Sequence, residues 1–227
     1  MKHRPIRVLC HGRQTIKLAR QYGWLPGARY TNLRDIRGFD EIGLIDIDWK
    51  EYNFQRHLDA VKAARPMLTI ARDVERRRDL RRTLDQANEL KEWCRWVVVV
   101  PKDPKMAEGL TELVPDSFLL GYSVPTRYGS TPISINSFGS RPVHLLGGRP
   151  DAQLRLSRLM NVHSFDGNRF TLDATFGDYF DGQIFRPHPL GGYFECITSS
   201  LKIINRLWRR YECDGRCERK RQRRKIL

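Results

Sequence analysis

Long hydrophobic runs are absent from this sequence of 227 residues. The longest apolar run, residues 96–101, is far shorter than the roughly 20 residues that a membrane-spanning helix needs. The first residues are basic and lead into only a short apolar stretch, which predicts no secretion signal. We therefore expect no membrane partner and a cytoplasmic location.

Cysteine is also scarce. The five cysteines are odd in number and widely spaced, which fits a reducing compartment better than a disulfide framework. Cys213 and Cys217 form a Cys-x3-Cys pair, with Cys196 and His188 far away in the sequence. That spacing is poor for zinc, so we expect neither a structural metal nor another cofactor.

Acidic residues are few relative to basic ones. The chain has 41 Lys and Arg against 26 Asp and Glu, a net charge of +15, which favours a polyanionic partner. Residues 206–227 alone hold ten basic and three acidic residues. We therefore expect a catalytic domain over residues 1–205, followed by a basic C-terminal helix and tail over residues 206–227.

Short apolar segments alternate with segments of helical period, which predicts an α/β fold built around a parallel sheet. The predicted strands are residues 6–10, 42–47, 67–71, 96–100, 118–124, 142–146 and 162–165, with a weaker one at 179–185. The predicted helices are residues 15–22, 54–64, 74–93, 105–113, 152–160 and 194–211. This order fits a compact (β/α)8 TIM-like barrel about as well as a doubly wound open sheet. Residues 126–141 are expected to form a long functional loop.

Polar residues follow several of the predicted strands, at the end where ligands gather in both architectures. Asp46 and Asp48 end one strand, Asp73 follows the next, and Asp166 ends the last one before the weaker candidate. An aspartate after a strand is also a common turn or helix-capping residue. Grouped carboxylates can hold a divalent metal, or divide into a nucleophile and a proton donor. The residues alone leave both chemistries open.

Three longer motifs carry a resemblance to a known family. They are Gly121-Tyr-Ser-Val-Pro-Thr, Pro142-Val-His-Leu-Leu-Gly-Gly-Arg-Pro and Ser164-Phe-Asp-Gly-Asn. In order and spacing they resemble the late barrel strands of the tRNA-guanine transglycosylase family. The closest resemblance is to the phage-type enzymes that insert 7-deazaguanines into DNA. A weaker resemblance extends back to the segments at Asp46 and Asp73, so that it covers roughly residues 41–168.

The resemblance implies a (β/α)8 barrel that exchanges guanine through a covalent sugar intermediate. It assigns the nucleophile to Asp166 and the remaining acid–base role to Asp46 or Asp48. Asp73 matches the carboxylate that recognises the base. Further substrate-binding residues would be Gly121, Ser123, Val124, Trp49, Lys102, His144, Gly147, Gly148 and Asn168. Lys102 stands where the family has a glutamine, which puts the preferred deazaguanine in doubt.

The implied partners are DNA and a 7-deazaguanine base such as 7-cyano-7-deazaguanine, and the location would be the host cytoplasm if a phage encodes the protein. The target base would have to be flipped out or read in a single strand. The expected phosphate contacts are Arg127, Arg141, Arg149, Arg169, Arg221, Arg223 and Arg224. Two alternatives stay open: a metal-dependent nuclease or phosphohydrolase that uses the same carboxylates, and a nucleic-acid-binding protein without catalysis.

Overall fold

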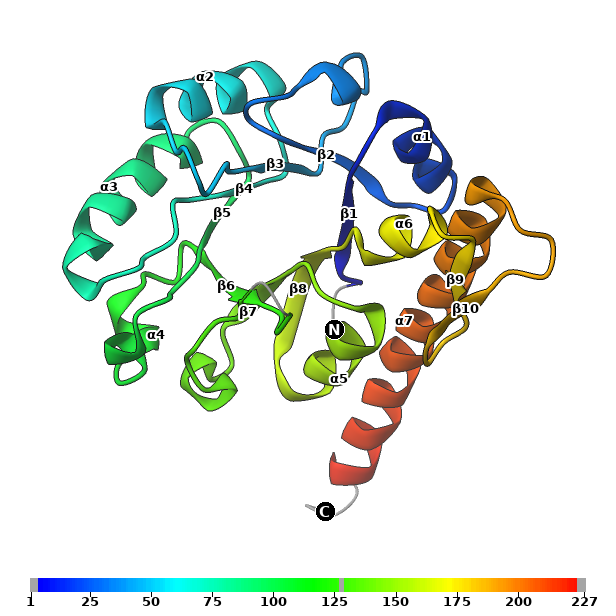
Figure 1. Ribbon diagram of the computed structural model, residues 1–227. Coiled ribbons are helices and arrows are strands. Elements are labelled where there is room, and N and C mark those ends of the chain that lie inside the picture. Colours follow the sequence, from blue (N-terminus) through cyan, green and yellow to red (C-terminus); the bar gives the residue numbers. More distant parts are fainter. Residues whose placement is uncertain (1–3, 127–128, 224–227) are drawn as a thin grey trace.

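A closed barrel of eight parallel strands forms the centre of the computed structural model, which describes residues 4–126 and 129–223, with residues 210–223 described by their backbone alone. The strands follow one another around the barrel in chain order, and β8 pairs with β1 (Figure 1). The barrel strands are β1 Ile6–Cys10, β2 Leu25–Arg29, β3 Leu44–Asp46, β4 Leu68–Ile70, β5 Trp96–Val99, β6 Leu119–Ser123, β7 Pro142–Leu146 and β8 Asn161–Asp166. The prediction of a compact (β/α)8 barrel is confirmed, and the open sheet is excluded.

Helices surround the barrel on the outside (Figure 1). They are α1 Arg13–Gln21, α2 Phe54–Ala64, α3 Leu80–Lys91, α4 Leu110–Leu113, α5 Pro150–Leu159, α6 Arg169–Ala174 and α7 Tyr193–Arg223. Two predicted helices were too long. The segment predicted as a helix from residue 74 starts with an extended stretch and a 3-10 turn, Arg77–Asp79, before α3. The segment from residue 105 likewise holds a 3-10 turn, Pro104–Met106, before the short α4.

Strand β2 was missed because Pro26 and Gly27 resemble a turn in sequence. The barrel interior explains the glycine: a Cβ on Gly27 would lie 2.5 Å from Cys10 Sγ and 2.7 Å from Val8 Cγ1. A side chain at this position has no room beside β1. The strand therefore contains glycine, which has a low strand propensity, because packing in the closed barrel leaves no room for a side chain at this position.

The prediction of one weak strand at residues 179–185 was wrong. This segment forms an antiparallel hairpin outside the barrel, with strands β9 Asp178–Phe180 and β10 Phe185–Pro187. The hairpin lies beside α7 (Figure 1), and the Phe180 N–H donates to Ser200 Oγ at 2.9 Å. The predicted loop at residues 126–141 holds one 3-10 turn, Ile135–Phe138.

Helix α7 runs without a break across the predicted boundary at residue 205. Asn205 accepts a hydrogen bond from Trp24 Nε1 at 3.0 Å and donates to the Tyr22 carbonyl at 2.8 Å. Beyond the boundary, Trp208 is buried and stacks on Phe165 of β8, with ring centroids 4.4 Å apart. The start of the expected extension is therefore part of the packed barrel. No described helix is long and apolar enough to cross a membrane.

Candidate active site

Asp46 and Asp166 are the last residues of β3 and β8. All eight barrel strands are parallel, so both carboxylates lie at the same end of the barrel, which we call the mouth. This is the end at which (β/α)8 enzymes carry their active sites. The loops that hold Asp73, Lys102 and Gly147 follow β4, β5 and β7 and lie at the mouth as well.

Asp166 has one carboxylate oxygen held in place and one open. Its Oδ1 accepts a hydrogen bond from the Gly147 N–H at 3.0 Å and lies 3.3 Å from His144 Nε2. No described residue hydrogen-bonds to Oδ2, and 17% of the side chain is exposed. His144 is fully buried, and its Nδ1 lies 2.8 Å from Ser164 Oγ. The surroundings thus fix the carboxylate plane and leave one oxygen for a ligand.

The two glycines after β7 have definite structural uses. Gly147 has a φ of +60°, a left-handed conformation that favours glycine. A Cβ on Gly148 would lie 2.4 Å from Val124 Cγ1. Both glycines are predicted substrate-binding residues, and the Gly147 N–H donates to Asp166 Oδ1.

Asp46 lies close enough to Asp166 for the two charges to interact. Burial raises the pKa of Asp46 to about 7, and the negative charge of Asp166 acts in the same direction. A hydrogen bond of 2.8 Å from the Ile47 N–H opposes the shift. Asp48 instead accepts the Lys50 N–H at 3.2 Å, a local turn contact. A carboxyl with a pKa near 7 can both donate and accept a proton at neutral pH.

A second polar group at the mouth comes from the loops after β4 and β5 and from the end of β6. Lys102 Nζ donates to Ser123 Oγ at 2.7 Å and to the Ser130 carbonyl at 3.3 Å. Burial raises the pKa of Asp73 to about 6, while the charge of Lys102 opposes this rise. The group therefore presents a carboxylate acceptor beside an ammonium and a hydroxyl.

The other predicted base contacts have mixed surroundings. A Cβ on Gly121 would lie 2.6 Å from Val100 Cγ2 and 2.9 Å from Val98 Cγ1, so barrel packing explains this glycine. Val124 is buried, and its N–H donates to the Leu146 carbonyl. Trp49, after β3, is 68% exposed. Asn168 is exposed at the N-terminus of α6.

The predicted phosphate-binding arginines do not form one group. Arg149 and Arg169 follow β7 and β8 at the mouth, and both guanidinium groups lie over the Phe185 ring. Arg141 precedes β7 at the opposite end and is buried, with the Thr111, Val114, Pro115 and Phe118 carbonyls accepting from it. We therefore remove Arg141 from the expected phosphate contacts. Arg127 and Arg224 lie outside the described residues, and Arg221 and Arg223 are described only as backbone of α7.

Three residues of the site were not predicted. Cys10 ends β1, and burial, followed by the charges of Asp46 and Asp166, raises its pKa well above the usual range. Arg29 ends the missed strand β2 directly opposite Asp46 in the β2–β3 register. Gln153, on α5, donates to the main-chain carbonyls of Gly147 and Asp166. Cys10 could have been found from its position at the end of a strand. Gln153 lies on a helix, where no position in the sequence pattern marks it as a site residue.

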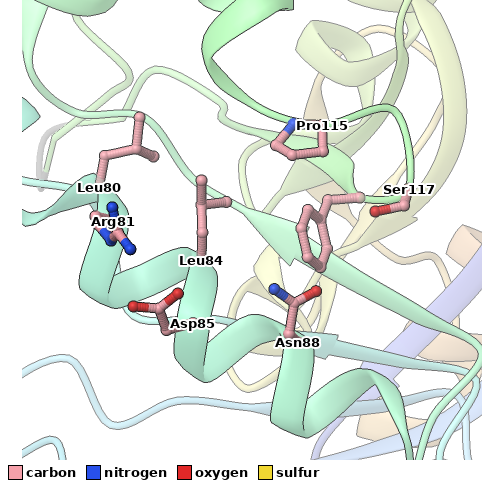
Figure 2. Close-up of a pocket in the computed structure, with 8 residues that line it drawn as sticks. Leu80, Arg81, Leu84, Asp85, Asn88, Pro115 and Ser117 are labelled. Carbon is pink, nitrogen blue, oxygen red and sulfur yellow. The ribbon is translucent and has the colours of Figure 1, made fainter.

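A surface groove of about 480 Å³ lies away from this site. Figure 2 shows its lining from α3, with Leu80 and Leu84, and from the turn before β6, with Pro115 and Ser117. The turn before β6 lies at the end of that strand opposite the mouth. The groove is therefore separate from the carboxylates.

The described part of the chain contains no group of three or more His, Cys, Asp or Glu side chains that could hold a metal ion. The side chains of Cys213 and Cys217 lie outside the described residues.

Together, the closed barrel and the carboxylates at its mouth define a (β/α)8-barrel protein with an acidic, partly buried polar site. The chain belongs to the family of unknown function DUF6610, which matches residues 19–209. The match covers seven of the eight barrel strands, from β2 to β8. No curated protein matches the chain.

Proposed function

We propose that the protein is a DNA guanine transglycosylase, which exchanges guanine for a 7-deazaguanine base such as 7-cyano-7-deazaguanine. The observation that carries the proposal is the pair formed by Asp166, with one oxygen held and one open, and Asp46, whose pKa is raised to about 7. Two carboxyl groups in different surroundings at one site can act as nucleophile and proton donor. The resemblance of the surrounding motifs to guanine transglycosylases supports the same assignment.

In the first step, Asp166 Oδ2 attacks C1′ of the deoxyribose as the bond from C1′ to N9 of guanine breaks. The bonding electrons pass to guanine, and the protonated Asp46 supplies the proton that the leaving base takes up. In the second step, Asp46 removes the N9 proton of the deazaguanine. N9 then attacks C1′, and the Asp166 carboxylate leaves.

The group of Asp73, Lys102 and Ser123 is suited to reading the edge of the base. A carboxylate can accept the adjacent N–H groups of a guanine-like edge, and an ammonium can donate to the neighbouring carbonyl oxygen. The Lys102–Ser123 hydrogen bond of 2.7 Å orients the ammonium. Lys102 would therefore supply the donor that the related enzymes take from a glutamine.

DNA is the proposed polymer because the motifs resemble those of the phage-type enzymes that act on DNA, and the net charge of +15 favours a polyanionic partner. Arg149 and Arg169 flank the mouth, and their side chains are 44% and 40% exposed. Arg149 pairs with Asp151 and Arg169 with Asp173, so DNA phosphates would have to compete with these carboxylates for the arginines. Such contacts fix the register of the duplex without reading its sequence.

The test measures release of labelled guanine from double-stranded DNA in EDTA, with and without 7-cyano-7-deazaguanine. We expect release that depends on the added base, without strand breaks, and its loss in Asp166→Asn. Asp85→Asn, an exposed substitution on α3, is the control and should keep full activity. Strand cleavage that requires added Mg²⁺ would replace the proposal with a nuclease. DNA binding by the wild type without any guanine release, and unchanged in Asp166→Asn, would replace it with a binding protein.

A further inference from the structure

Gln153 lies near the start of α5, and its side chain reaches the site. It is 2% exposed. Its Nε2 donates to the Gly147 carbonyl at 2.7 Å and to the Asp166 carbonyl at 2.6 Å. A side-chain amide nitrogen has two hydrogens, and two carbonyl acceptors at these distances use both of them.

These two hydrogen bonds join the ends of β7 and β8. Gly147 follows β7 directly, and Asp166 is the last residue of β8. The β-ladder between the two strands ends at the pair Leu145 and Phe165, two residues before Gly147 and one residue before Asp166. Gln153 therefore continues the connection beyond the ladder, where no further backbone pair holds the two chain segments together.

Gly147 needs such a connection more than another residue would. A glycine samples many backbone conformations, and the Gly147 N–H reaches Asp166 Oδ1 in the observed left-handed turn. Because Gln153 holds the Gly147 carbonyl, the Gly147 N–H stays directed at the Asp166 carboxylate. The same side chain holds the main-chain carbonyl of Asp166, so both partners of the 3.0 Å contact are fixed by one amide.

We propose that Gln153 is a positioning residue for Asp166: it keeps the Gly147 N–H on Oδ1 so that Oδ2 faces the reacting sugar. This inference rests on the proposed function, because it takes Asp166 as the nucleophile. Within the described part of the chain, the Gln153 side chain hydrogen-bonds to main-chain carbonyls alone, and it acts through Gly147 and Asp166. Displacement of a reacting group by about 1 Å lowers a rate by up to about 100-fold.

The structural test follows the Gly147 amide by NMR hydrogen exchange and does not depend on any activity. In Gln153→Met, which keeps the size of the side chain but has no donor, we expect exchange of this amide to be at least about tenfold faster than in the wild type. The control is Leu156→Ala on the same helix, which weakens packing of α5 without touching Gly147. It should leave the exchange of this amide, relative to amides of the barrel core, unchanged.

The kinetic test uses guanine exchange at saturating and limiting DNA. In Gln153→Met we expect kcat to fall by about 10- to 100-fold with KM nearly unchanged. Gln153→Glu should recover part of this loss at low pH, because a protonated carboxyl can donate one of the two hydrogen bonds and an ionised one cannot. Leu156→Ala should show neither effect.

The two tests separate the failure of this inference from failure of the proposed function. Unchanged exchange of the Gly147 amide in Gln153→Met, or a rise in KM with unchanged kcat, would overturn the role of Gln153. If the wild type releases no guanine, the proposed function fails. Faster amide exchange in Gln153→Met would still support the hold on Asp166 in that case, and unchanged exchange would overturn it.

Discussion

Asp46 and Asp166 end two strands of one parallel barrel, and the charge of Asp166 helps burial to raise the pKa of Asp46 to about 7. The two carboxyl groups differ in what holds them. Each accepts one backbone N–H, from Gly147 at Asp166 and from Ile47 at Asp46. Asp166 also lies 3.3 Å from His144 Nε2, whereas burial is the main cause of the raised pKa of Asp46. On this difference the proposed function assigns the nucleophile to Asp166 and the proton donor to Asp46.

Asp166→Asn should lower guanine exchange by at least about 1000-fold, because an amide oxygen is a poor nucleophile toward C1′. It should also lower the pKa of Asp46, since the neighbouring charge that raises it is removed. Single-turnover exchange measures the first effect, and ¹³C NMR titration of the Asp46 carboxyl measures the second. Asp48→Asn is the matched control. Its side-chain oxygen can still accept the Lys50 N–H, so both readouts should stay near wild type.

Asp46→Asn should make the protein more stable at alkaline pH while it removes activity. A carboxyl group whose pKa is higher in the folded state than in the unfolded state stabilises the fold below the unfolded pKa, and this contribution is lost as pH rises to the folded pKa. For Asp46 the loss extends from about pH 4 to about pH 7. Asparagine does not titrate, so the Tm of Asp46→Asn relative to the wild type should rise by about 5–10 °C between pH 5 and pH 8. A difference in Tm that does not depend on pH would contradict the raised pKa.

The sequence allowed the barrel to be predicted where strands are apolar and β-branched, as in β5 Trp96–Val99. It did not reveal β2, because Gly27 satisfies a packing requirement inside the barrel that no local pattern expresses. The hairpin of β9 and β10 was mistaken for one strand, because aromatic residues continue on both sides of its short turn at Gly182. Local propensity thus predicted elements whose burial is uniform and failed where tertiary contacts decide.

The same distinction applies to the site. Asp46 and Asp166 could be predicted because the carboxyl ends of parallel strands must meet at one end of a barrel. The choice between Asp46 and Asp48 could not, because it depends on which carboxyl interacts with the charge of Asp166 and which one accepts a hydrogen bond from its own loop. Arg141 was assigned to DNA by its charge, although its partners are carbonyls at the opposite end of the barrel.

Arg141→Gln should reduce stability without weakening DNA binding. The substitution leaves buried carbonyls without their donor, which costs on the order of 2–3 kcal/mol and lowers Tm by about 4–10 °C. Arg149→Gln should show the opposite pattern, with Tm nearly unchanged and weaker binding, because its side chain is exposed at the mouth. Calorimetry and fluorescence anisotropy with labelled duplex DNA measure the two quantities. Weaker binding by folded Arg141→Gln would contradict the structural role.

Two C-terminal truncations separate packing from charge in α7. Removal of residues 210–227 keeps Trp208 on Phe165, so the fold should persist, with Tm within about 3 °C of the full chain. Removal of residues 206–227 deletes Trp208, and loss of a buried aromatic side chain costs about 3–5 kcal/mol. This shorter protein should unfold at a Tm lower by roughly 6–15 °C.

The protein that lacks residues 210–227 then isolates the electrostatic contribution of the tail to DNA binding. Residues 210–227 carry eight Lys and Arg against three Asp and Glu. Each phosphate that a protein neutralises adds about 0.9 to the slope of log affinity against log salt. If the tail binds the DNA backbone, its removal should reduce that slope by about 2–5 and weaken binding most at low salt. Anisotropy titrations from 50 to 300 mM salt would measure the slope, and an unchanged slope would assign DNA binding to the barrel mouth alone, with Arg149 and Arg169 as its cationic groups.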